Sequence, residues 1–457
     1  MTASALPPGL LLAYYGDDFT GSTDAMEAMT MAGIETVLFL TPPTPALAAR
    51  FPTARCVGIA GSSRGRDPAW MRRELPAAFS SLAALNPPVL HYKVCSTFDS
   101  SPTTGSIGCA TELGVQHARQ NWSPSIVGVP RLKRYQAFGN LFAAVKGVAH
   151  RIDRHPTMSR HPVTPMAEAD LRLHLGKQTT RRIELIDMVA LADGSAAAQL
   201  NDLRGDDVPT VFIDVLNDET LVEAGRLVWE QRGEGVFSAS SSGLPYALTA
   251  YWRAQGWVAK DVALPRAAPV RSIAAVSGSC SPVTAGQIAW ARDNGFTVER
   301  MALDQALKES SYAEEIARLV ALAVGVLDAG GSPLIFSAEG PNDSAVVNFD
   351  EIATKAGLSR SDAARKVGQA LAAVMQGIVD QRPLKRVVIA GGDSSGEVMS
   401  MLDIDALTVA AELTPGAPLC RAWSSHPVRE GLELVLKGGQ IGLEDFFGLA
   451  RDGIVMP

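Results

Sequence analysis

The sequence predicts an α/β protein of two domains, each built on a mainly parallel sheet flanked by helices. Short apolar runs alternate with stretches of helical spacing, which is typical of parallel strands joined by crossover helices. At 457 residues the chain is too long for one ordinary hydrophobic core, so two domains are expected. Several apolar runs break into glycine, hydroxyl and carboxylate residues, as at binding sites on the carboxyl edge of a parallel sheet.

In the first half, alternating apolar runs predict strands followed by helices. We expect strands at residues 10–15, 35–40, 56–60, 88–94 and 210–215, and a helix over residues 22–32 that stops at Gly33. Residues 151–165 are rich in His, Arg and Pro, and proline blocks regular structure, so we expect a loop there. Such a loop often faces a ligand, although a solvated linker is the alternative.

The second half repeats the pattern after a segment with the composition of a linker. Residues 252–271 contain Pro265, Pro269 and short Ala-rich stretches, which favours a linker. Strands are expected at residues 272–276, 334–337 and 386–390, with helices near 284–294 and over 361–381. The predicted domains are residues 1–255 and 272–457, joined by residues 256–271.

Composition excludes several classes of protein. The net charge of -7 argues against nucleic acid as a partner, because phosphate backbones need basic stripes. Five cysteines without a C-x-x-C spacing indicate reduced thiols and a cytoplasmic location. We expect no secretory signal and no membrane partner, since no uncharged apolar run reaches roughly 18 residues. The apolar content is compatible with a homodimer, but no segment identifies an interface.

The first polar motif places two carboxylates directly after a strand. Asp17 and Asp18 stand between Gly16 and Gly21, and adjacent carboxylates can divide proton transfer and substrate binding. A helix N-cap followed by a first-turn acid is the alternative, and it readily explains one of the two aspartates. The functional interpretation is favoured somewhat, because two aspartates are harder to explain as caps.

Further polar residues follow the other strands of the first half. Lys93, Ser96 and Asp99 bring a cation, a hydroxyl and a carboxylate together, and a capped turn is the alternative. Arg64 can hold a carboxylate through two parallel hydrogen bonds, although a surface arginine is the commoner role. His161 can donate to a substrate oxygen or serve a structural hydrogen bond. No histidine has metal-ligand spacing, so no protein metal site is predicted.

The second half carries glycine and hydroxyl motifs. Residues 277–281 (SGSCS) and 391–396 (GGDSSG) each follow an apolar strand, and such loops let backbone N–H groups approach a phosphate. Each can also be a plain tight turn. Residues 437–442 (KGGQIG) form a third, weaker glycine loop, and none of the three has the Walker A spacing.

Taken in order, these motifs resemble the four-carbon acid sugar kinase family. The matching segments are residues 17–21 (DDFTG), 93–100 (KVCSTFDS), 277–281, 391–396 and 436–447 (LKGGQIGLEDFF). The sequence departs from the family pattern at Ser394, where threonine is usual, and at Gly438, Gln440, Ile441 and Leu443. Residues 21–24 (GSTD) and the loop at 151–165 suggest a distinct subgroup. That subgroup resembles the 3-oxo-isoapionate branch at least as much as the threonate branch.

The resemblance implies an N-terminal sugar-acid domain, a C-terminal ATP domain and an active site in the cleft between them. It implies phosphorylation of a terminal hydroxyl of an acid such as threonate, erythronate, 3-oxo-tetronate or 3-oxo-isoapionate. Mg²⁺ is expected with ATP, held mainly by phosphates and water. The implied acid-site residues are Asp17, Asp18, Arg64, Lys93, Ser96, Asp99 and His161. The implied nucleotide-site residues are Ser279, Gly391, Gly392, Asp393, Ser394 and Gly439.

Within this interpretation Asp18 is the first candidate for the catalytic base and Asp17 its close rival, with Arg64 and Lys93 neutralising the substrate carboxylate. The alternative functions are a dehydrogenase and a binding protein. A dehydrogenase is disfavoured because no Gly-x-Gly-x-x-Gly follows the first strand. A two-lobed small-acid or nucleotide-binding protein without turnover is disfavoured by the two phosphate-type loops.

Overall fold

The computed structural model describes residues 5–117, 119–145, 147–161, 163–260 and 262–453, and it divides into two compact units. Unit 1 is Met1–Ala263 and unit 2 is Leu264–Pro457. The boundary falls within the range predicted as a linker. Trp252, at the start of the proline- and alanine-rich stretch, is fully buried in helix α9 (Gly243–Ala254), which ends before the predicted linker begins at residue 256.

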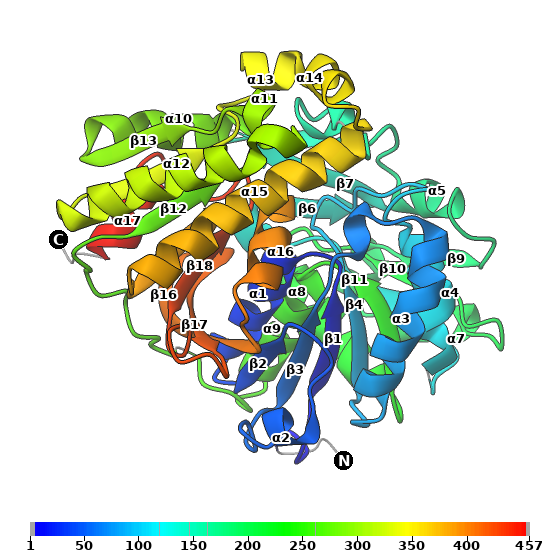
Figure 1. Ribbon diagram of the computed structural model, residues 1–457. Helices are drawn as coiled ribbons and strands as arrows, with labels where there is room; N and C mark the ends of the chain where they lie inside the picture. Colours follow the sequence, from blue (N-terminus) through cyan, green and yellow to red (C-terminus); the bar gives the residue numbers. More distant parts are fainter. Residues whose placement is uncertain (1–4, 118, 146, 162, 261, 454–457) are drawn as a thin grey trace. The chain divides into compact units, whose positions relative to one another are not determined.

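Unit 1 contains a parallel sheet with the strand order β11-β4-β1-β3-β2 (Figure 1). Its strands are β1 (Leu12–Gly16), β2 (Thr36–Phe39), β3 (Cys56–Ala60), β4 (Val89–Lys93) and β11 (Val236–Ser240). Helices α1 (Phe19–Thr30), α8 (Asp218–Gln231) and α9 cover one face, and α3 (Pro68–Ala83) and α4 (Ile107–Gly114) cover the other. All these strands are buried on both faces, which explains why they read as continuous apolar runs.

Two small sheets complete unit 1. Strands β5 (Ser123–Ser125), β10 (Thr210–Ile213) and β9 (Ile183–Ile186) form a parallel sheet in that order. Strands β6 (Arg134–Ala137), β7 (Asn140–Val145) and β8 (Val148–Arg151) form an antiparallel one. The remaining helices are α2 (Pro45–Ala48), α5 (Leu171–Gly176), α6 (Met188–Asp193) and α7 (Ala196–Leu203). The loop expected at residues 151–165 begins at the end of β8 and contains short 3-10 turns at Ile152–Arg154 and Met158–Arg160.

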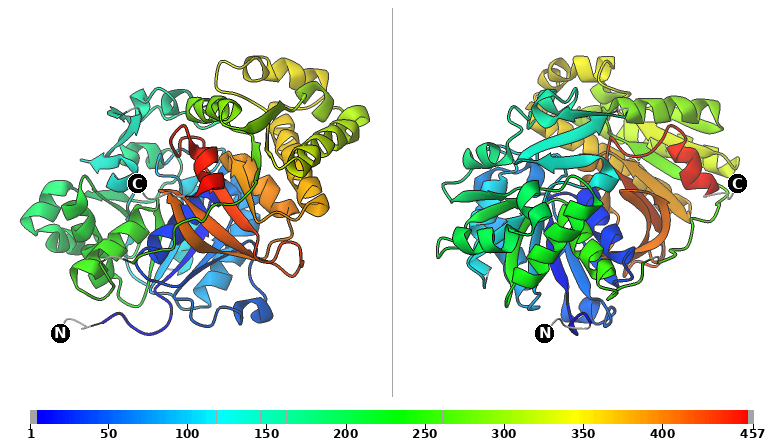
Figure 2. Two further views of the ribbon diagram at one scale, coloured as in Figure 1. Left: turned by 90° about the vertical axis from the view of Figure 1, so that its left-hand side faces the viewer. Right: turned by 180° about the vertical axis from the view of Figure 1, so that it is seen from behind.

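Unit 2 contains a sheet in the order β16-β17-β18-β15-β12-β14-β13. Neighbours from β18 to β13 are parallel, whereas β16 and β17 form an antiparallel edge that continues onto β18. Figure 2 shows this edge, in orange, from two further sides. The strands are β12 (Ala274–Ser277), β13 (Phe296–Arg300), β14 (Ser332–Phe336), β15 (Arg386–Ala390), β16 (Ala406–Thr414), β17 (Ala417–Trp423) and β18 (Glu433–Lys437).

Helices surround this second sheet. They are α10 (Pro282–Asp293), α11 (Leu303–Ala306), α12 (Glu309–Asp328), α13 (Ser344–Val347), α14 (Phe349–Lys355), α15 (Arg360–Gln381), α16 (Gly392–Met401) and α17 (Phe446–Asp452). One core cluster joins strands β12, β14, β15, β17 and β18 to α10 and α17. No helix among the described residues is long and apolar enough to span a membrane.

Candidate active site

The carboxyl ends of β1, β3 and β4 lie side by side in unit 1 (Figure 1). Gly16 at the end of β1 pairs with Ala60 on one side and with Lys93 on the other. Backbone hydrogen bonds continue beyond the strands, from Asp17 N to Lys93 O at 2.8 Å and from Arg64 N to Asp17 O at 3.1 Å. The parallel register therefore gathers three of the predicted polar segments at one edge.

Arg64 bridges the two aspartates. Its Nε and Nη2 donate to the Asp17 carboxylate at 3.2 and 3.0 Å, and its Nη1 donates to Asp18 Oδ2. Burial alone would lower the pKa of the Arg64 guanidinium, but the two carboxylates outweigh burial and raise the pKa above its ordinary value. Arg64 therefore carries a permanent positive charge between two nearly buried carboxylates.

Asp18 also caps helix α1. Its Oδ1 accepts from Gly21 N at 2.7 Å and its Oδ2 accepts from Thr20 Oγ1 at 3.1 Å. The N-cap alternative is thus correct for Asp18, which explains why α1 begins three residues earlier than predicted. A Cβ on Gly21 would lie 2.6 Å from Asp18 Oδ1 and 2.7 Å from Lys93 Nζ, so only glycine fits there.

Asp17 has fewer hydrogen-bond donors than Asp18. Within the described part of the chain, its side-chain hydrogen bonds come from Arg64, and the residue is 4% exposed. Burial raises the pKa of Asp17 to about 6, although the charge of Arg64 opposes the rise. A carboxylate that titrates near neutral pH is suited to accept a proton.

Lys93 is buried among carboxylates. Its Nζ donates to Val94 O at 2.7 Å, and the residue is 1% exposed. Burial raises the pKa of Asp24 in helix α1, and the charge of Lys93 is the strongest opposing influence. Lys93 thus balances the negative charge that α1 and the end of β1 bring into this part of unit 1.

Asp99 lies in a second cluster with His161. Thr164 Oγ1 donates to Asp99 Oδ2 at 3.0 Å, and Thr164 N donates to His161 Nδ1 at 3.1 Å. Burial would raise the pKa of Asp99, but the charge of Arg64 and the hydroxyls of Thr97 and Thr164 lower it. The proline-rich loop therefore reaches the site, and Asp99 stays ionised there.

The segment after β4 contains the predicted residue Ser96 and further polar residues that the sequence analysis did not select. Ser96 is partly exposed between Lys93 and Asp99. Thr97 donates to Asp99 Oδ1, and Ser100 Oγ lies 3.0 Å from His174 Nε2 in helix α5. Thr97 lies in the motif at residues 93–100, and Thr164 lies in the loop at residues 151–165. The sequence indicated these two residues only through their position near predicted site residues.

Three glycine and hydroxyl loops meet in unit 2. They follow the neighbouring parallel strands β18, β15 and β12, so their starts lie at one edge of the sheet. Gly278 N donates to Ala390 O at 2.9 Å, and Gly391 N donates to Lys437 O at 2.9 Å. A Cβ on Gly439 would lie 2.8 Å from Ser279 Oγ, which places the third loop against the first.

Two glycines permit this close approach. Gly391 has φ +120°, and a Cβ there would lie 3.3 Å from both Ser279 N and Ser394 Oγ. A Cβ on Gly278 would lie 1.9 Å from Ser394 Oγ. Helix α16 begins at Gly392, so its unpaired N–H groups open at the same place. The structure thus brings Ser279, Gly391, Gly392, Ser394 and Gly439 together, whereas the side chain of Asp393 is outside the described part of the chain.

Lys437 is a buried cation beneath these loops that sequence reasoning did not select. Its Nζ donates to Thr284 Oγ1 at 2.9 Å, and Thr284 Oγ1 donates to Gly439 O at 3.1 Å. The residue is fully buried, and burial lowers the pKa of Lys437 to about 7. Its only sequence signal was its place at the start of the weakest glycine loop.

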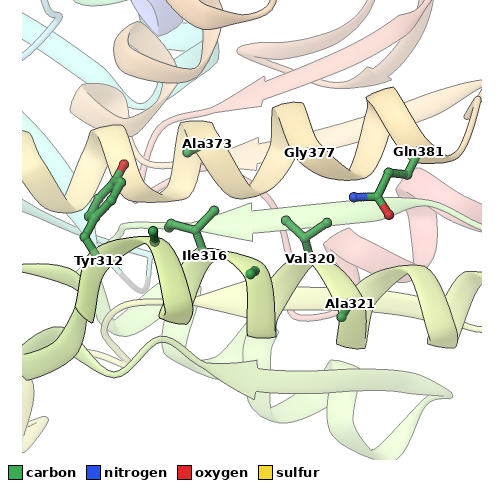
Figure 3. Close-up of a pocket in the computed structure, with 9 residues that line it drawn as sticks. Tyr312, Ile316, Val320, Ala321, Ala373, Gly377 and Gln381 are labelled. Atoms are coloured by element: carbon green, nitrogen blue, oxygen red, sulfur yellow. The ribbon is translucent and has the colours of Figure 1, made fainter. Parts of the chain in front are cut away.

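Two surface hollows lie in unit 2. An apolar groove between α12 and α15 is lined by Tyr312, Ile316, Val320, Ala373 and their neighbours (Figure 3). It offers no charged side chain for a phosphate or an acid. A second, open hollow of about 480 Å³ lies beside the first turn of α10 and is lined by Pro282, Ala285, Arg300 and residues 339–343.

Metal-binding side chains do not cluster in the described ranges. Among those residues, no group of three or more His, Cys, Asp and Glu side chains is arranged to hold a metal ion. A magnesium ion that arrives with ATP needs no such group, because phosphate oxygens and water supply most of its ligands.

Comparison with known proteins identifies both units. Residues 12–248 match the family model described as "Sugar-binding N-terminal domain", and residues 274–447 match that described as "Nucleotide-binding C-terminal domain". The chain belongs to the four-carbon acid sugar kinase family. It is a sugar-acid kinase, and the resemblance drawn from the ordered motifs is confirmed.

Curated relatives match along nearly the full chain. The chain is 65% identical over 451 residues to the 3-oxo-isoapionate kinase of Paraburkholderia graminis, covering 99% of this chain and 96% of that protein. It is 30% identical over 450 residues to the 3-oxo-tetronate kinase of Methylobacterium radiotolerans, covering 97% and 99%. A solved structure of a Salmonella typhimurium LT2 protein has a TM-score of 0.74 at 25% identity, covering 96% of this chain and 98% of that one. The predicted fold class is confirmed.

Proposed function

We propose that this kinase transfers the γ-phosphoryl group of ATP to a terminal hydroxyl of 3-oxo-isoapionate. The 65% identity with a 3-oxo-isoapionate kinase, against about 30% with 3-oxo-tetronate kinases, is the observation that carries the choice of substrate. The acid-site loop at residues 151–165 and the substrate-facing segment after β4 both belong to unit 1, the matched sugar-binding domain.

Unit 1 supplies the catalytic base. Sequence alone placed Asp18 ahead of Asp17 as the base, and the hydrogen bonds favour the reverse order. Asp18 already accepts from Gly21 N, Thr20 Oγ1 and Arg64. Among the described residues, only Arg64 donates to the Asp17 side chain, and the pKa of Asp17 is raised to about 6. We assign proton acceptance to Asp17 and orientation of Arg64 and α1 to Asp18.

Unit 2 binds the nucleotide. The N–H groups at the start of α16 and the hydroxyls of Ser279 and Ser394 are placed to hold phosphate oxygens. The hollow beside α10 is adjacent to Ser281, the N-cap of that helix, and is suited to the nucleoside part of ATP. Mg²⁺ would be held by the phosphates and water and would neutralise charge as the phosphoryl group is transferred.

Transfer requires the acid on unit 1 and the phosphate on unit 2 to meet in line, with water excluded. The predicted cleft between the domains serves this step, and it stays a prediction. Compaction of the chain on adding ATP and the acid, measured by small-angle scattering, would support closure. An unchanged radius of gyration would oppose it.

The direct test is ADP release from MgATP across a panel of acids. The panel contains 3-oxo-isoapionate, 3-oxo-tetronates, D- and L-threonate and D-erythronate, with ATP alone as the control. The highest kcat/KM is expected for 3-oxo-isoapionate, and ³¹P NMR of the product should show one new phosphate monoester. A higher kcat/KM for a four-carbon acid would replace the substrate assignment. No turnover with any acid, despite ATP binding, would favour the binding-protein alternative.

Two further expectations remain predictions. The homodimer would be tested by light scattering of the purified chain. The cytoplasmic location would be tested by fractionation of cells that express it.

A further inference from the structure

The two predicted cations of the acid site, Arg64 and Lys93, already have partners in the protein. A sugar acid brings a carboxylate into a site that already holds Asp17, Asp18 and Asp99, so a cation must offset it. Three of the N–H groups of Arg64 already bind the two adjacent aspartates. Lys93 is buried, with its Nζ on a backbone carbonyl and its charge set against Asp24. Both cations that the sequence suggested for the carboxylate therefore already have negatively charged neighbours in the protein.

Arg134 differs from these cations in its partners. Its Nη1 donates to two neutral carbonyls, Leu132 O at 3.1 Å and Lys133 O at 3.3 Å. Its Nε is covered and has no hydrogen-bond partner. Within the described ranges, no carboxylate lies within ion-pair distance of its guanidinium, so its Nε–Nη2 edge has no protein acceptor. That edge is the one that binds a carboxylate through two parallel hydrogen bonds.

The backbone holds Arg134 at the acid site. It opens β6, and its N and O are both bonded to Val129, at 3.1 and 2.8 Å. The preceding residue, Lys133, has φ +55°, which turns the chain sharply into the strand. The segment that leads to Arg134 is tied to the edge that carries Lys93, because Ser241 Oγ donates to Val127 O at 2.8 Å and Val94 N donates to Ser240 O at 2.8 Å. Burial and the charge of Arg134 lower the pKa of His155, in the loop that carries His161.

We propose that Arg134 binds the carboxylate of the sugar acid and sets the preference of the enzyme for acids over uncharged sugars. This inference rests on the proposed function, because it presumes that the enzyme turns over a sugar acid. Arg64 then holds the catalytic aspartates instead of the substrate carboxylate. Burial without an opposing carboxylate lowers the pKa of Arg134, as expected for a cation whose counter-ion is a ligand.

The experiment compares 3-oxo-isoapionate with its methyl ester, which differs from it in charge at one end. The ratio of the two kcat/KM values measures the preference for the acid. In Arg134→Gln we expect the acid preference to fall about 10- to 100-fold, through a higher KM for the acid, with KM for ATP unchanged. The matched control is Arg182→Gln, which removes a cation beside β9 in the same unit. Its partners are Asp207 and Glu184, and it should keep the wild-type ratio.

The outcomes separate this inference from the proposed function. Turnover by the wild type with an unchanged acid preference in Arg134→Gln would overturn the role of Arg134 while leaving the kinase assignment intact. If the wild type instead turns over a different acid of the panel, that acid and its methyl ester replace the pair. If no acid is turned over, both fail. Should Arg134→Gln not fold, as judged by circular dichroism, Arg134→Met keeps the aliphatic stem and is judged by the same ratio.

Discussion

The polar edge of unit 1 is built from charged side chains, whereas the polar edge of unit 2 is built from glycines and hydroxyls. Both lie at the carboxyl ends of adjacent parallel strands, so the same sheet geometry serves two kinds of chemistry. At the first edge, Arg64 and Lys93 are set against buried aspartates. At the second, Lys437 donates to the hydroxyl of Thr284, and the first N–H groups of α16 have no intrahelical acceptor. The paired charges at the edge of unit 1 suit proton transfer. The backbone N–H donors at the edge of unit 2 suit the phosphates of a nucleotide.

The largest effect is expected from the aspartates of unit 1. Asp17→Asn should lower kcat by about 10²–10⁴-fold if Asp17 accepts the hydroxyl proton, with KM for ATP unchanged. Steady-state kinetics of Asp17→Asn beside Asp18→Asn would measure it. Near-normal turnover in Asp17→Asn with an inactive Asp18→Asn would return the role of base to Asp18.

The pH profile separates the two aspartates further. The pKa of Asp17 is raised to about 6, so below pH 6 the carboxyl is protonated and cannot accept a proton. The kcat/KM of the wild type should therefore fall about tenfold per pH unit below that point. If the kcat/KM of Asp17→Asn still falls below pH 6, the titrating group is another residue.

An intermediate effect is expected at the nucleotide edge. Gly391→Ala places a Cβ 3.3 Å from Ser279 N at a backbone φ of +120°, which a side chain rarely adopts. We expect KM for ATP to rise about 10- to 100-fold and KM for the acid to stay within about twofold, from a conformational cost of roughly 1–3 kcal/mol. Gly325→Ala in helix α12 is the matched control, since a Cβ there meets nothing within 4 Å. Equal losses in the two variants would contradict the close approach of the loops.

The smallest effect is expected from Lys437. Lys437→Met breaks the connection through Thr284 to Gly439, and KM for ATP should rise about three- to tenfold. Between pH 7 and the ordinary lysine pKa of 10.5, the unfolded chain binds a proton that the folded chain does not. This group therefore makes the free energy of unfolding rise with pH in that window, and the methionine variant should lose the rise. Chemical denaturation at pH 7 and pH 9 would measure it, and an identical slope in both proteins would refute it.

The sequence predicted elements where the local pattern was sufficient. Strands β3 and β15 have the predicted bounds, because each is an apolar run ended by a small polar loop. Helix α1 begins at Phe19 and not at residue 22 as predicted, because the Asp18 side chain accepts from Gly21 N and caps the helix. The antiparallel edge β16–β17 was missed because β16 is only partly buried and the apolar run of β17 contains Pro418 and Arg421.

The site residues that lie in sequence motifs were predicted. Those whose role depends on tertiary contacts were missed. The parallel register explains why separate motifs gather at one edge in each unit. Arg134 lies in none of the motifs, and Lys437 only opens the weakest of them. The interest of Arg134 lies in the counter-ion that it lacks among the described residues. A missing counter-ion is visible only once the neighbours of a cation are in place.

The division of chemistry between the two edges is tested most directly by calorimetric titration. A non-hydrolysable ATP analogue with Mg²⁺, and separately 3-oxo-isoapionate, would be titrated into the wild type, Arg134→Gln and Gly391→Ala. We expect Arg134→Gln to lose affinity for the acid alone and Gly391→Ala to lose affinity for the nucleotide alone, each by at least tenfold. Loss of nucleotide affinity in Arg134→Gln, or of acid affinity in Gly391→Ala, would contradict two separate binding edges.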